Sequence, residues 1–367
     1  MITSDMSWVS NSSSSANSDD TLPNSQLPIL NTYIALTIFL SLVGTAGNIL
    51  VIFAVFTSKK LRVLQNVFIV NLAVADLLVT SLVNPFAVVG ALDMGKLFYR
   101  LPALCEFLAT LVVTSCGCSI WSIISSVSLN RYFYICHRVI YTKIYNQRTV
   151  PFMVIGLWLI AFLIDLPNYL GWGDHIFDTR NFFCTYDYAY NFSYTRGYVT
   201  VLGFVVPVCI LCYSYFRIFV VFRGSNRRIR KHVTNPSSQN QENQDKRLLK
   251  TVGMICIVFM VMWAPYFITV IFGLDSNFWW FFTATFMALT NSSVNFLIYA
   301  TDRNFRQAYS DLWKLYVCSC DCLVTNSENI LITGWTKTGP GNVEMTESSG
   351  KTNITVESSV TSDVTPN

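Results

Sequence analysis

The sequence predicts an all-α membrane protein, a bundle of seven transmembrane helices. Of its 367 residues, 52% are hydrophobic and only 13% are charged, whereas soluble domains carry about a quarter charged residues. The apolar residues gather in seven runs of about 20 residues or more, each long enough to cross a hydrocarbon core about 30 Å thick. These runs are continuous, whereas the strands of a membrane β-barrel would alternate over about ten residues.

The seven runs define the predicted helices and bound the bundle at residues 33–300. In order, they cover Tyr33–Phe56, Val67–Val89, Leu104–Cys136, Val150–Trp172, Tyr198–Phe222, Leu248–Gly273 and Phe278–Ala300. Residues 1–32 and 323–367 are poor in apolar residues and rich in Ser, Thr and Asn, a composition that predicts disorder.

Residues 301–322 follow the last span and predict a short eighth helix. Phe305, Tyr309 and Trp313 repeat at helical spacing on one face, so this helix is expected to lie on the membrane surface. Acyl chains on nearby cysteines would anchor its end, and free cytosolic thiols are the alternative. The candidate cysteines are Cys318, Cys320 and Cys322.

The placement of Lys and Arg predicts the orientation. No basic residue precedes Lys59, and the loops after the first, third and fifth spans hold most of the others. Cytoplasmic loops carry the excess of positive charge, so the N-terminus is expected outside the cell and the C-terminus inside, in the plasma membrane. The net charge of +4 sums these loop charges and gives no reason to expect nucleic acid as a partner.

Two kinds of modification are predicted on the extracellular side. Asn11 and Asn191 begin Asn-X-Ser acceptor patterns for N-glycosylation. Cys105 and Cys184 are the pair of cysteines that faces the oxidising exterior, so a disulfide between them is expected to hold the second extracellular loop over the bundle.

Asp76 is an ionisable residue in the middle of the second span, where burying a charge is costly. Asn291 and Asn295 supply polar groups from the seventh span. Ser119 falls beside Asp76 when helix three is counted from Cys105 but not when it is counted from Arg131. These groups suit a sodium ion. The alternative is a structural hydrogen-bond network around a protonated Asp76, and no other cofactor or metal is expected.

A set of short motifs, in order along all seven spans, resembles the rhodopsin-like family of G-protein-coupled receptors. The motifs are Gly47-Asn48, Leu72-Ala-Val-Ala-Asp76, Cys105, Asn130-Arg131-Tyr132, Trp158, Pro207 with Tyr215, Trp263-Ala-Pro265 and Asn295-Phe-Leu-Ile-Tyr299. The resemblance implies that Arg131 contacts a heterotrimeric G protein or is restrained by Asp245. Because Asn130 stands where the family usually has an acid, we expect raised basal signalling.

The same resemblance implies a set of activation switches. Trp263, with Phe259 one turn below and Pro265 above, matches the hinge of helix six, since proline removes a backbone hydrogen bond. Tyr215 and Tyr299 match the tyrosines that close the cytoplasmic opening of the active state. Core packing is the alternative role for these aromatic residues.

Further motifs resemble the melatonin receptors and imply a binding pocket. They are Asn130–His137, Leu166-Pro-Asn168, Cys184-Thr-Tyr186, Cys212–Ile218 and Asn291–Tyr299. Asn168 matches a ligand-binding amide of those receptors and Tyr186 an aromatic that stacks on the indole. However, Tyr188, Gly203 and Phe267 stand where Gln, His and Asn are expected. The pocket is expected to contain Val112, Asn168, Tyr186, Tyr188, Gly203, Trp263, Tyr266 and Phe267.

The pocket composition favours a small, neutral, aromatic ligand. Helix seven has no lysine for a retinal Schiff base, and helix three has no Asp from Glu106 to Leu129 to pair with a protonated amine. An orphan receptor with another ligand, or with mainly constitutive signalling, is the alternative. A transporter would need inverted repeats with broken helices and an enzyme a catalytic constellation, and the sequence contains neither.

Helix three is one residue longer between Cys105 and Arg131 than the resemblance implies. One extra residue turns a helix by roughly 100°, so we predict a π-bulge between Trp121 and Asn130. On the cytoplasmic side, the basic loop from Arg223 to Arg247 is expected to meet acidic lipid, an inhibitory-type G protein, or both. Ser and Thr residues between Thr346 and Thr365 are candidate phosphorylation sites for arrestin binding.

Overall fold

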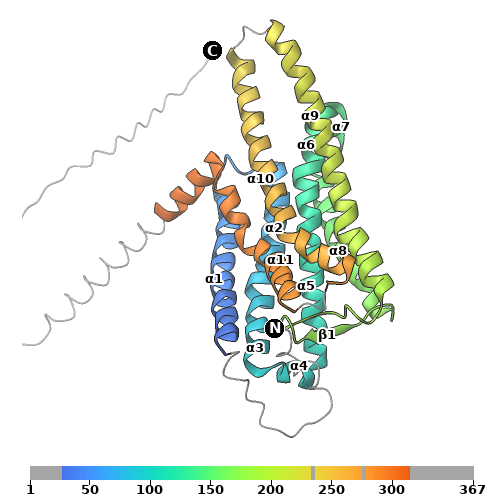
Figure 1. Cartoon of the computed structure of the whole chain (residues 1–367). Helices are drawn as coiled ribbons and strands as arrows, with labels where there is room; N and C mark the ends of the chain where they lie inside the picture. The colour runs from blue at the N-terminus through green and yellow to red at the C-terminus, as the bar shows by residue number, and fades with distance from the viewer. Residues whose placement is uncertain (1–26, 233–235, 275–277, 315–367) are drawn as a thin grey trace, which may run out of the picture. The chain divides into compact units, whose positions relative to one another are not determined.

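The computed structural model describes residues 27–232, 236–274 and 278–314. The chain divides into two compact units, Met1–Trp313 and Lys314–Asn367, and the features described below lie in the first, apart from Lys314 at the end of the last helix. Its membrane-crossing helices lie side by side in one bundle (Figure 1). They are α1 (Leu27–Thr57), α2 with α3 (Val67–Leu78 and Asn84–Asp93), α5 with α6 (Pro102–Ile123 and Asn130–Cys136), α8 (Thr149–Tyr169), α9 (Val206–His232), α10 (Pro236–Phe272) and α11 (Phe278–Tyr299).

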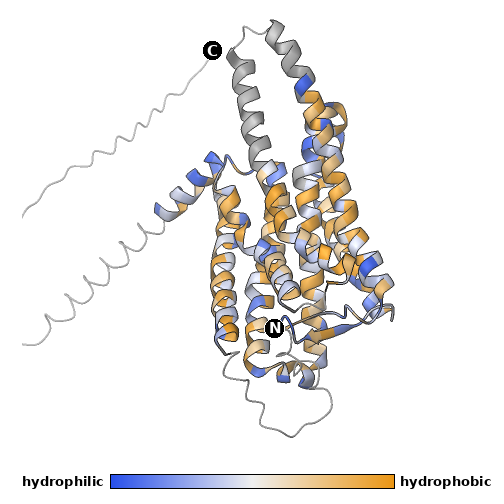
Figure 2. Cartoon of the chain, in the orientation of Figure 1, coloured by the Kyte–Doolittle hydropathy of each residue, from blue (hydrophilic) through white to orange (hydrophobic). Residues whose placement is uncertain are grey.

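The helices of this bundle consist mostly of apolar residues (Figure 2), and many large apolar side chains are exposed on the outside. Leu42, Phe152 and Leu170 are each exposed by two thirds or more of their surface. Among the described residues, six helices are long and apolar enough to cross a membrane, and a shorter apolar helix, Cys256–Phe272, lies within α10. Lipid must cover a belt of this kind, and the predicted seven-helix fold is confirmed.

Several of these helices contain π-helical turns. The turn η3 (Ile124–Leu129) lies between α5 and α6, so the bulge predicted from the spacing of helix three is confirmed. With the extra residue taken up in this turn, Ser119 contacts Asp76 and Arg131, further along the same helix, is also buried. Three further π-turns were not predicted: η2 (Val79–Val83), η4 (Ser193–Val199) and η5 (Val201–Val205).

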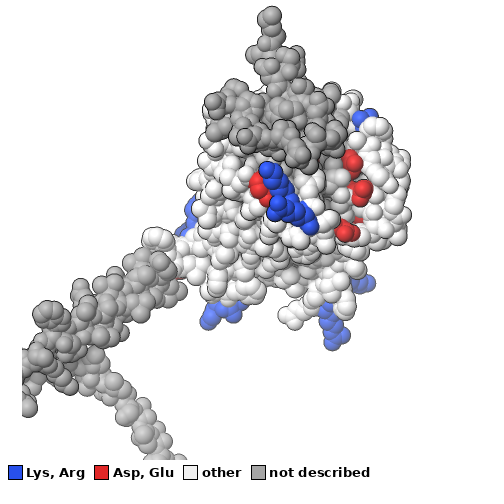
Figure 3. Space-filling view, turned by 90° about the horizontal axis from the view of Figure 1, so that it is seen from below, with Lys and Arg blue, Asp and Glu red and all other residues white. Residues whose placement is uncertain are grey.

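A β-hairpin that the sequence analysis did not predict closes one end of the bundle. The strands β1 (His175–Asp178) and β2 (Phe183–Tyr186) pair antiparallel, with Phe177 opposite Cys184. A disulfide joins Cys105 to Cys184, as predicted. All four residues of β2 are buried, so the strand is part of the core. Seen from this end, most of the visible surface is uncharged (Figure 3).

Short helices complete the described chain. They are α4 (Lys96–Arg100), α7 (Arg138–Ile144), the 3-10 turn η1 (Leu64–Asn66) and a helix over residues 303–314. The last is the predicted eighth helix. Its Phe305 is buried and stacks on Tyr299 of α11, with ring centroids 5.3 Å apart, whereas Trp313 is 68% exposed.

Candidate functional site

An apolar cavity of about 70 Å³ lies between the helices beneath β2. Helices α5, α10 and α11, the turn η5 and the strand β2 all contribute side chains to it. Seven of the eight predicted pocket residues line it: Val112, Tyr186, Tyr188, Gly203, Trp263, Tyr266 and Phe267. Pockets for drug-sized ligands usually measure about 300 Å³ or more. A ligand of that size therefore requires the lining side chains to move.

Three tyrosines supply polar atoms to this cavity. The Tyr266 hydroxyl is the hub, hydrogen-bonded to the hydroxyl of Tyr186 and, at 3.0 Å, to that of Tyr188. Burial raises the pKa of Tyr186 and of Tyr188 above the usual value, so both phenols stay protonated. Three hydroxyl protons serve two bonds within this phenol triad. At least one proton is left for another acceptor, such as a ligand oxygen.

Phe267 fills the space beside Gly203. A Cβ atom at Gly203 would lie 3.3 Å from the Phe267 ring, which is a tight contact. Phe204 stacks on this ring with centroids 4.5 Å apart. The missing side chain at position 203 is thus compensated by an aromatic ring, and this wall of the cavity is apolar where the resemblance led us to expect polar groups.

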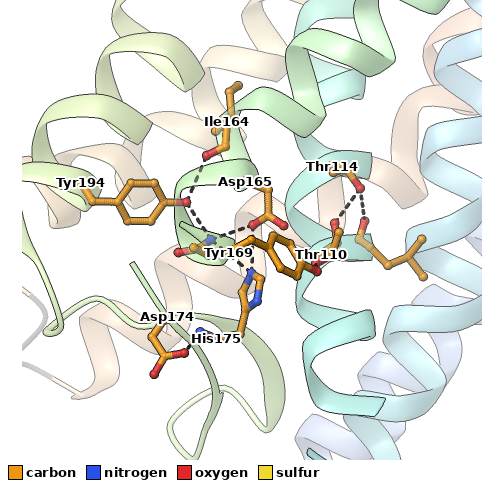
Figure 4. A network of polar contacts seen from close by, with 10 residues as sticks. Thr110, Thr114, Ile164, Asp165, Tyr169, Asp174, His175 and Tyr194 are labelled. Carbon is orange, nitrogen blue, oxygen red and sulfur yellow. Dashed lines mark hydrogen bonds and ion pairs between the residues drawn. The ribbon is translucent and has the colours of Figure 1, made fainter. Parts of the chain in front are cut away.

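Asn168, the eighth predicted pocket residue, is not among the residues that line the cavity. Its side-chain nitrogen lies 2.8 Å from Asp165 Oδ1, 3.1 Å from His175 Nε2 and 2.8 Å from the Tyr194 hydroxyl. His175 Nε2 lies 3.0 Å from the same Asp165 oxygen. Figure 4 shows this Asp165 network, in which α8 meets the hairpin and Tyr194 of the turn η4. The amide is therefore committed to the scaffold rather than to the cavity.

The sequence analysis missed Asp165 and His175, although a signal for Asp165 was present. Asp165 is an ionisable residue within a predicted span, which is by itself a reason to expect a function or a partner. It is fully buried. The position of His175 depends on the hairpin, and nothing in the local sequence predicted that strand pairing.

A column of aromatic rings leads from the cavity towards the centre of the bundle. The Trp263 ring lies 6.0 Å from that of Tyr266 and 6.5 Å from that of Phe259. Phe259 and Trp263 are buried, and Pro265 lies inside α10 just above them. A ligand that moves Tyr266 would therefore press on Trp263 at the point where α10 lacks a backbone hydrogen bond.

Below this column, Asp76 is the centre of a polar cluster. The carboxylate is fully buried and accepts hydrogen bonds from Ser119 Oγ at 3.0 Å and Asn295 Nδ2 at 2.7 Å. Asn291 is 1% exposed, and neither of its amide atoms has a hydrogen-bond partner among the described residues. Of the predicted sodium-site residues, Ser119 and Asn295 thus hydrogen-bond to Asp76. Asn291 offers an amide that has no partner among the described residues.

The structure also describes the contacts of the predicted switch residues at the opposite end of the bundle from the hairpin. Tyr132 hydrogen-bonds His137 at 3.0 Å, and the Cys256 thiol lies 3.5 Å from the Tyr215 hydroxyl. Arg131 is 9% exposed. Asn130 is fully buried, and both of its amide atoms lack a partner among the described residues.

Several predicted positions lie outside the described part of the chain. These are the side chain of Asp245, the acceptor Asn11, and Cys318, Cys320 and Cys322. Asn191 is described: its Oδ1 accepts hydrogen bonds from the backbone and hydroxyl of Ser193, the third residue of its acceptor pattern.

Comparison with known proteins identifies the family. Residues 47–299 match the profile of the 7 transmembrane receptor (rhodopsin family). The chain is 31% identical to melatonin receptor type 1A of Phodopus sungorus over 82% of this chain and 85% of that protein. It is 32% identical to melatonin receptor type 1C of Xenopus laevis over 74% and 65%.

Among solved structures, squid rhodopsin matches with a TM-score of 0.68 at 23% identity, over 82% of this chain and 89% of that one. This match supports the fold. Together the fold, the motif residues and the family profile leave no support for an enzyme. The chain belongs to the rhodopsin family of seven-transmembrane, G-protein-coupled receptors and is a divergent relative of the melatonin receptors.

Proposed function

We propose that this plasma-membrane receptor binds a small, neutral, aromatic ligand, similar to melatonin, in the cavity beneath β2. The observation that carries the proposal is the cavity's lining. Among the residues that the structure describes, those lining it include the phenol triad and Trp263 but no carboxylate, guanidinium or amine. A protonated amine would lose its hydration there without gaining a counter-charge. A flat ring with a neutral hydrogen-bond acceptor gains both apolar contact and a phenol donor.

The ligand would act through the aromatic column. Its ring would displace Tyr266 or Tyr186, and the change would pass to Trp263 through their shared packing. We further propose an extracellular N-terminus and an inhibitory-type G protein on the cytoplasmic side. Acidic lipid at the basic loop between helices five and six, and arrestin after phosphorylation of the C-terminal tail, complete the expected partners.

We also propose that Asp76 holds a sodium ion, together with Ser119, Asn291 and Asn295. Carboxylate, hydroxyl and amide oxygens suit a hard cation, and the unpartnered Asn291 amide supports the proposal. The ligand-free receptor should then melt at a higher temperature in sodium chloride than in N-methylglucamine chloride. This difference should vanish in an Asp76→Asn variant. An equal difference in that variant would contradict the sodium site.

The ligand proposal is tested in cells that express the receptor. Melatonin should lower stimulated cyclic AMP, and a Tyr186→Ala variant should lose this response because the aromatic wall is gone. Tyr190→Ala is the matched control, since Tyr190 lies in the same loop but is 54% exposed. An equal response from both variants would contradict the assignment of the cavity.

Mainly constitutive signalling is a second candidate function. The observation that favours it is that the cavity measures only about 70 Å³, and that Tyr186 and Tyr188 of the hairpin segment are among the residues that line it. In this case the Tyr186→Ala variant should lower signalling measured without any added ligand, whereas Tyr190→Ala should not.

A further inference from the structure

Gln65 provides Arg131 with an uncharged partner from another helix. The Gln65 Oε1 atom accepts a hydrogen bond of 2.8 Å from Arg131 Nη1. Gln65 lies on η1, the 3-10 turn that precedes α2, whereas Arg131 lies on α6. A guanidinium is always charged, and its burial makes each acceptor matter because hydrogen bonds from charged donors are among the stronger ones.

The other end of the same amide is also occupied. Gln65 Nε2 donates a hydrogen bond of 2.9 Å to the hydroxyl of Tyr141 on α7. The Tyr141 ring is in turn held by stacking on Tyr145 at 4.9 Å and by an edge contact with Tyr134 at 5.3 Å. A continuous chain of contacts therefore joins Arg131, through Gln65, to the short helix that follows helix three.

The backbone around Gln65 is fixed as well. Asn66 Nδ2 donates a hydrogen bond of 2.7 Å to the carbonyl of Leu61, and the Asn66 backbone N–H donates to Val63. Leu61 itself is buried. The turn is thus tied down on both sides of Gln65, and the side chain reaches Arg131 from a rigid support.

Asn130 does not replace this contact. Its amide is fully buried, and neither atom has a hydrogen-bond partner among the described residues. We therefore propose that Gln65 is a positioning residue, a neutral latch that holds Arg131 against the bundle in the resting receptor, with Tyr141 fixing its orientation. Arg131 is 9% exposed, and in this proposal the Gln65 bond opens when Arg131 turns towards a cytoplasmic partner.

The test is basal nucleotide exchange, measured without ligand on membranes that contain equal amounts of folded receptor. Purified heterotrimers from each Gα class are used in turn, so a wrong assignment of the inhibitory type does not affect the result. Gln65→Leu should raise basal exchange about fivefold to tenfold, because Arg131 loses an acceptor. Gln65→Glu should lower it below wild type, because the carboxylate pairs with Arg131 and can accept a hydrogen bond from the Tyr141 hydroxyl, to which the wild-type amide donates.

Two further variants separate a latch from a merely structural role. Tyr141→Phe should raise exchange about twofold in the wild-type background and should have no effect when Gln65 is already Leu, since the hydroxyl acts through the amide. Gln307→Leu is the matched control: Gln307 is an exposed cytoplasmic amide that accepts a hydrogen bond from Lys60. Wild-type exchange in Gln65→Leu, or an increase in Gln65→Glu, would overturn the proposal.

Discussion

The cavity beneath β2 and the cluster around Asp76 lie in the same bundle but differ in how their polar groups are paired. In the cavity, the three tyrosine hydroxyls of the phenol triad, from Tyr186, Tyr188 and Tyr266, bond to one another, and Thr185 and Thr285 add two further hydroxyls to an otherwise apolar lining. Around Asp76, the carboxylate has two partners, while the buried Asn291 amide has none among the described residues. The cavity therefore accommodates an apolar ring, whereas the cluster retains polar capacity for an ion or water.

This difference depends on what each region is built from. Regular helices supply all the groups around Asp76, and the spacing of residues along a helix fixes where they point. The cavity takes Tyr186 and Tyr188 from the hairpin segment, whose position depends on a disulfide and on the Asp165 network. Perturbing the hairpin should therefore damage the cavity and leave the cluster intact, and the following predictions test that separation.

The disulfide should have the largest effect. Replacing Cys105 and Cys184 together by Ser should lower the free energy of unfolding by about 3 kcal/mol, since the bridge closes a long loop; the two cysteines are 79 positions apart. Ligand-dependent signalling should be lost. Any sodium-dependent change in melting temperature of the remaining folded receptor should persist, and its loss would show that the two regions are not separate.

Disrupting the Asp165 network should have the next largest effect. His175→Ala should lower the free energy of unfolding by about 2 kcal/mol, because it removes a hydrogen bond from a fully buried carboxylate. Asp174→Ala is the control, since the exposed Asp174 carboxylate caps only the neighbouring backbone N–H. Thermal unfolding of purified receptor measures both. Equal melting temperatures for the two variants would show that the pairing of Asp165 with His175 contributes no stability.

Substitutions in the phenol triad should differ in how much they lower the free energy of unfolding. Tyr266→Phe removes the hub and leaves two hydroxyls without their partner, which should cost about 1–2 kcal/mol. Tyr188→Phe leaves the bond between Tyr186 and Tyr266 in place and should cost about 0.5 kcal/mol. Chemical denaturation or melting curves can compare them. If Tyr188→Phe proves the more harmful, Tyr266 is not the hub.

The smallest effect is expected at Asn130. Asn130→Asp places a carboxylate beside Arg131 and should lower basal signalling about twofold to threefold, a change of roughly 0.5 kcal/mol in the equilibrium between resting and active receptor. Ligand affinity should hardly change, because Asn130 lies far along helix three from the cavity. Basal exchange equal to wild type would show that the missing acid has no consequence.

Much of the helical part was predictable from the sequence. The contact between Ser119 and Asp76 agrees with the count along helix three from Cys105, and not with the count from Arg131. The surplus residue that separates the two counts predicted the π-turn at Ile124–Leu129. Helical periodicity links sequence spacing directly to direction. The same holds for Phe259 and Trp263, which lie one turn apart on α10 with their rings in contact.

The loop-dependent part was not predictable in the same way. Asn168 fits a ligand-binding motif, yet its amide bonds to Asp165 and His175, because the hairpin brings the histidine across from another segment. The phenol triad likewise needs the hairpin to place two of its three members. Gln65 was missed because its role depends on Arg131, which lies 66 positions away in the chain.

Binding to purified receptor tests the central claim most directly, that the cavity selects neutral aromatic ligands. N-acetyltryptamine and tryptamine form a matched pair that differs only by the acetyl group, and only tryptamine is protonated at neutral pH. The acetylated compound should raise the melting temperature of wild-type receptor, with a smaller shift in Tyr186→Ala, while tryptamine should have little effect. A larger shift with tryptamine would contradict the account.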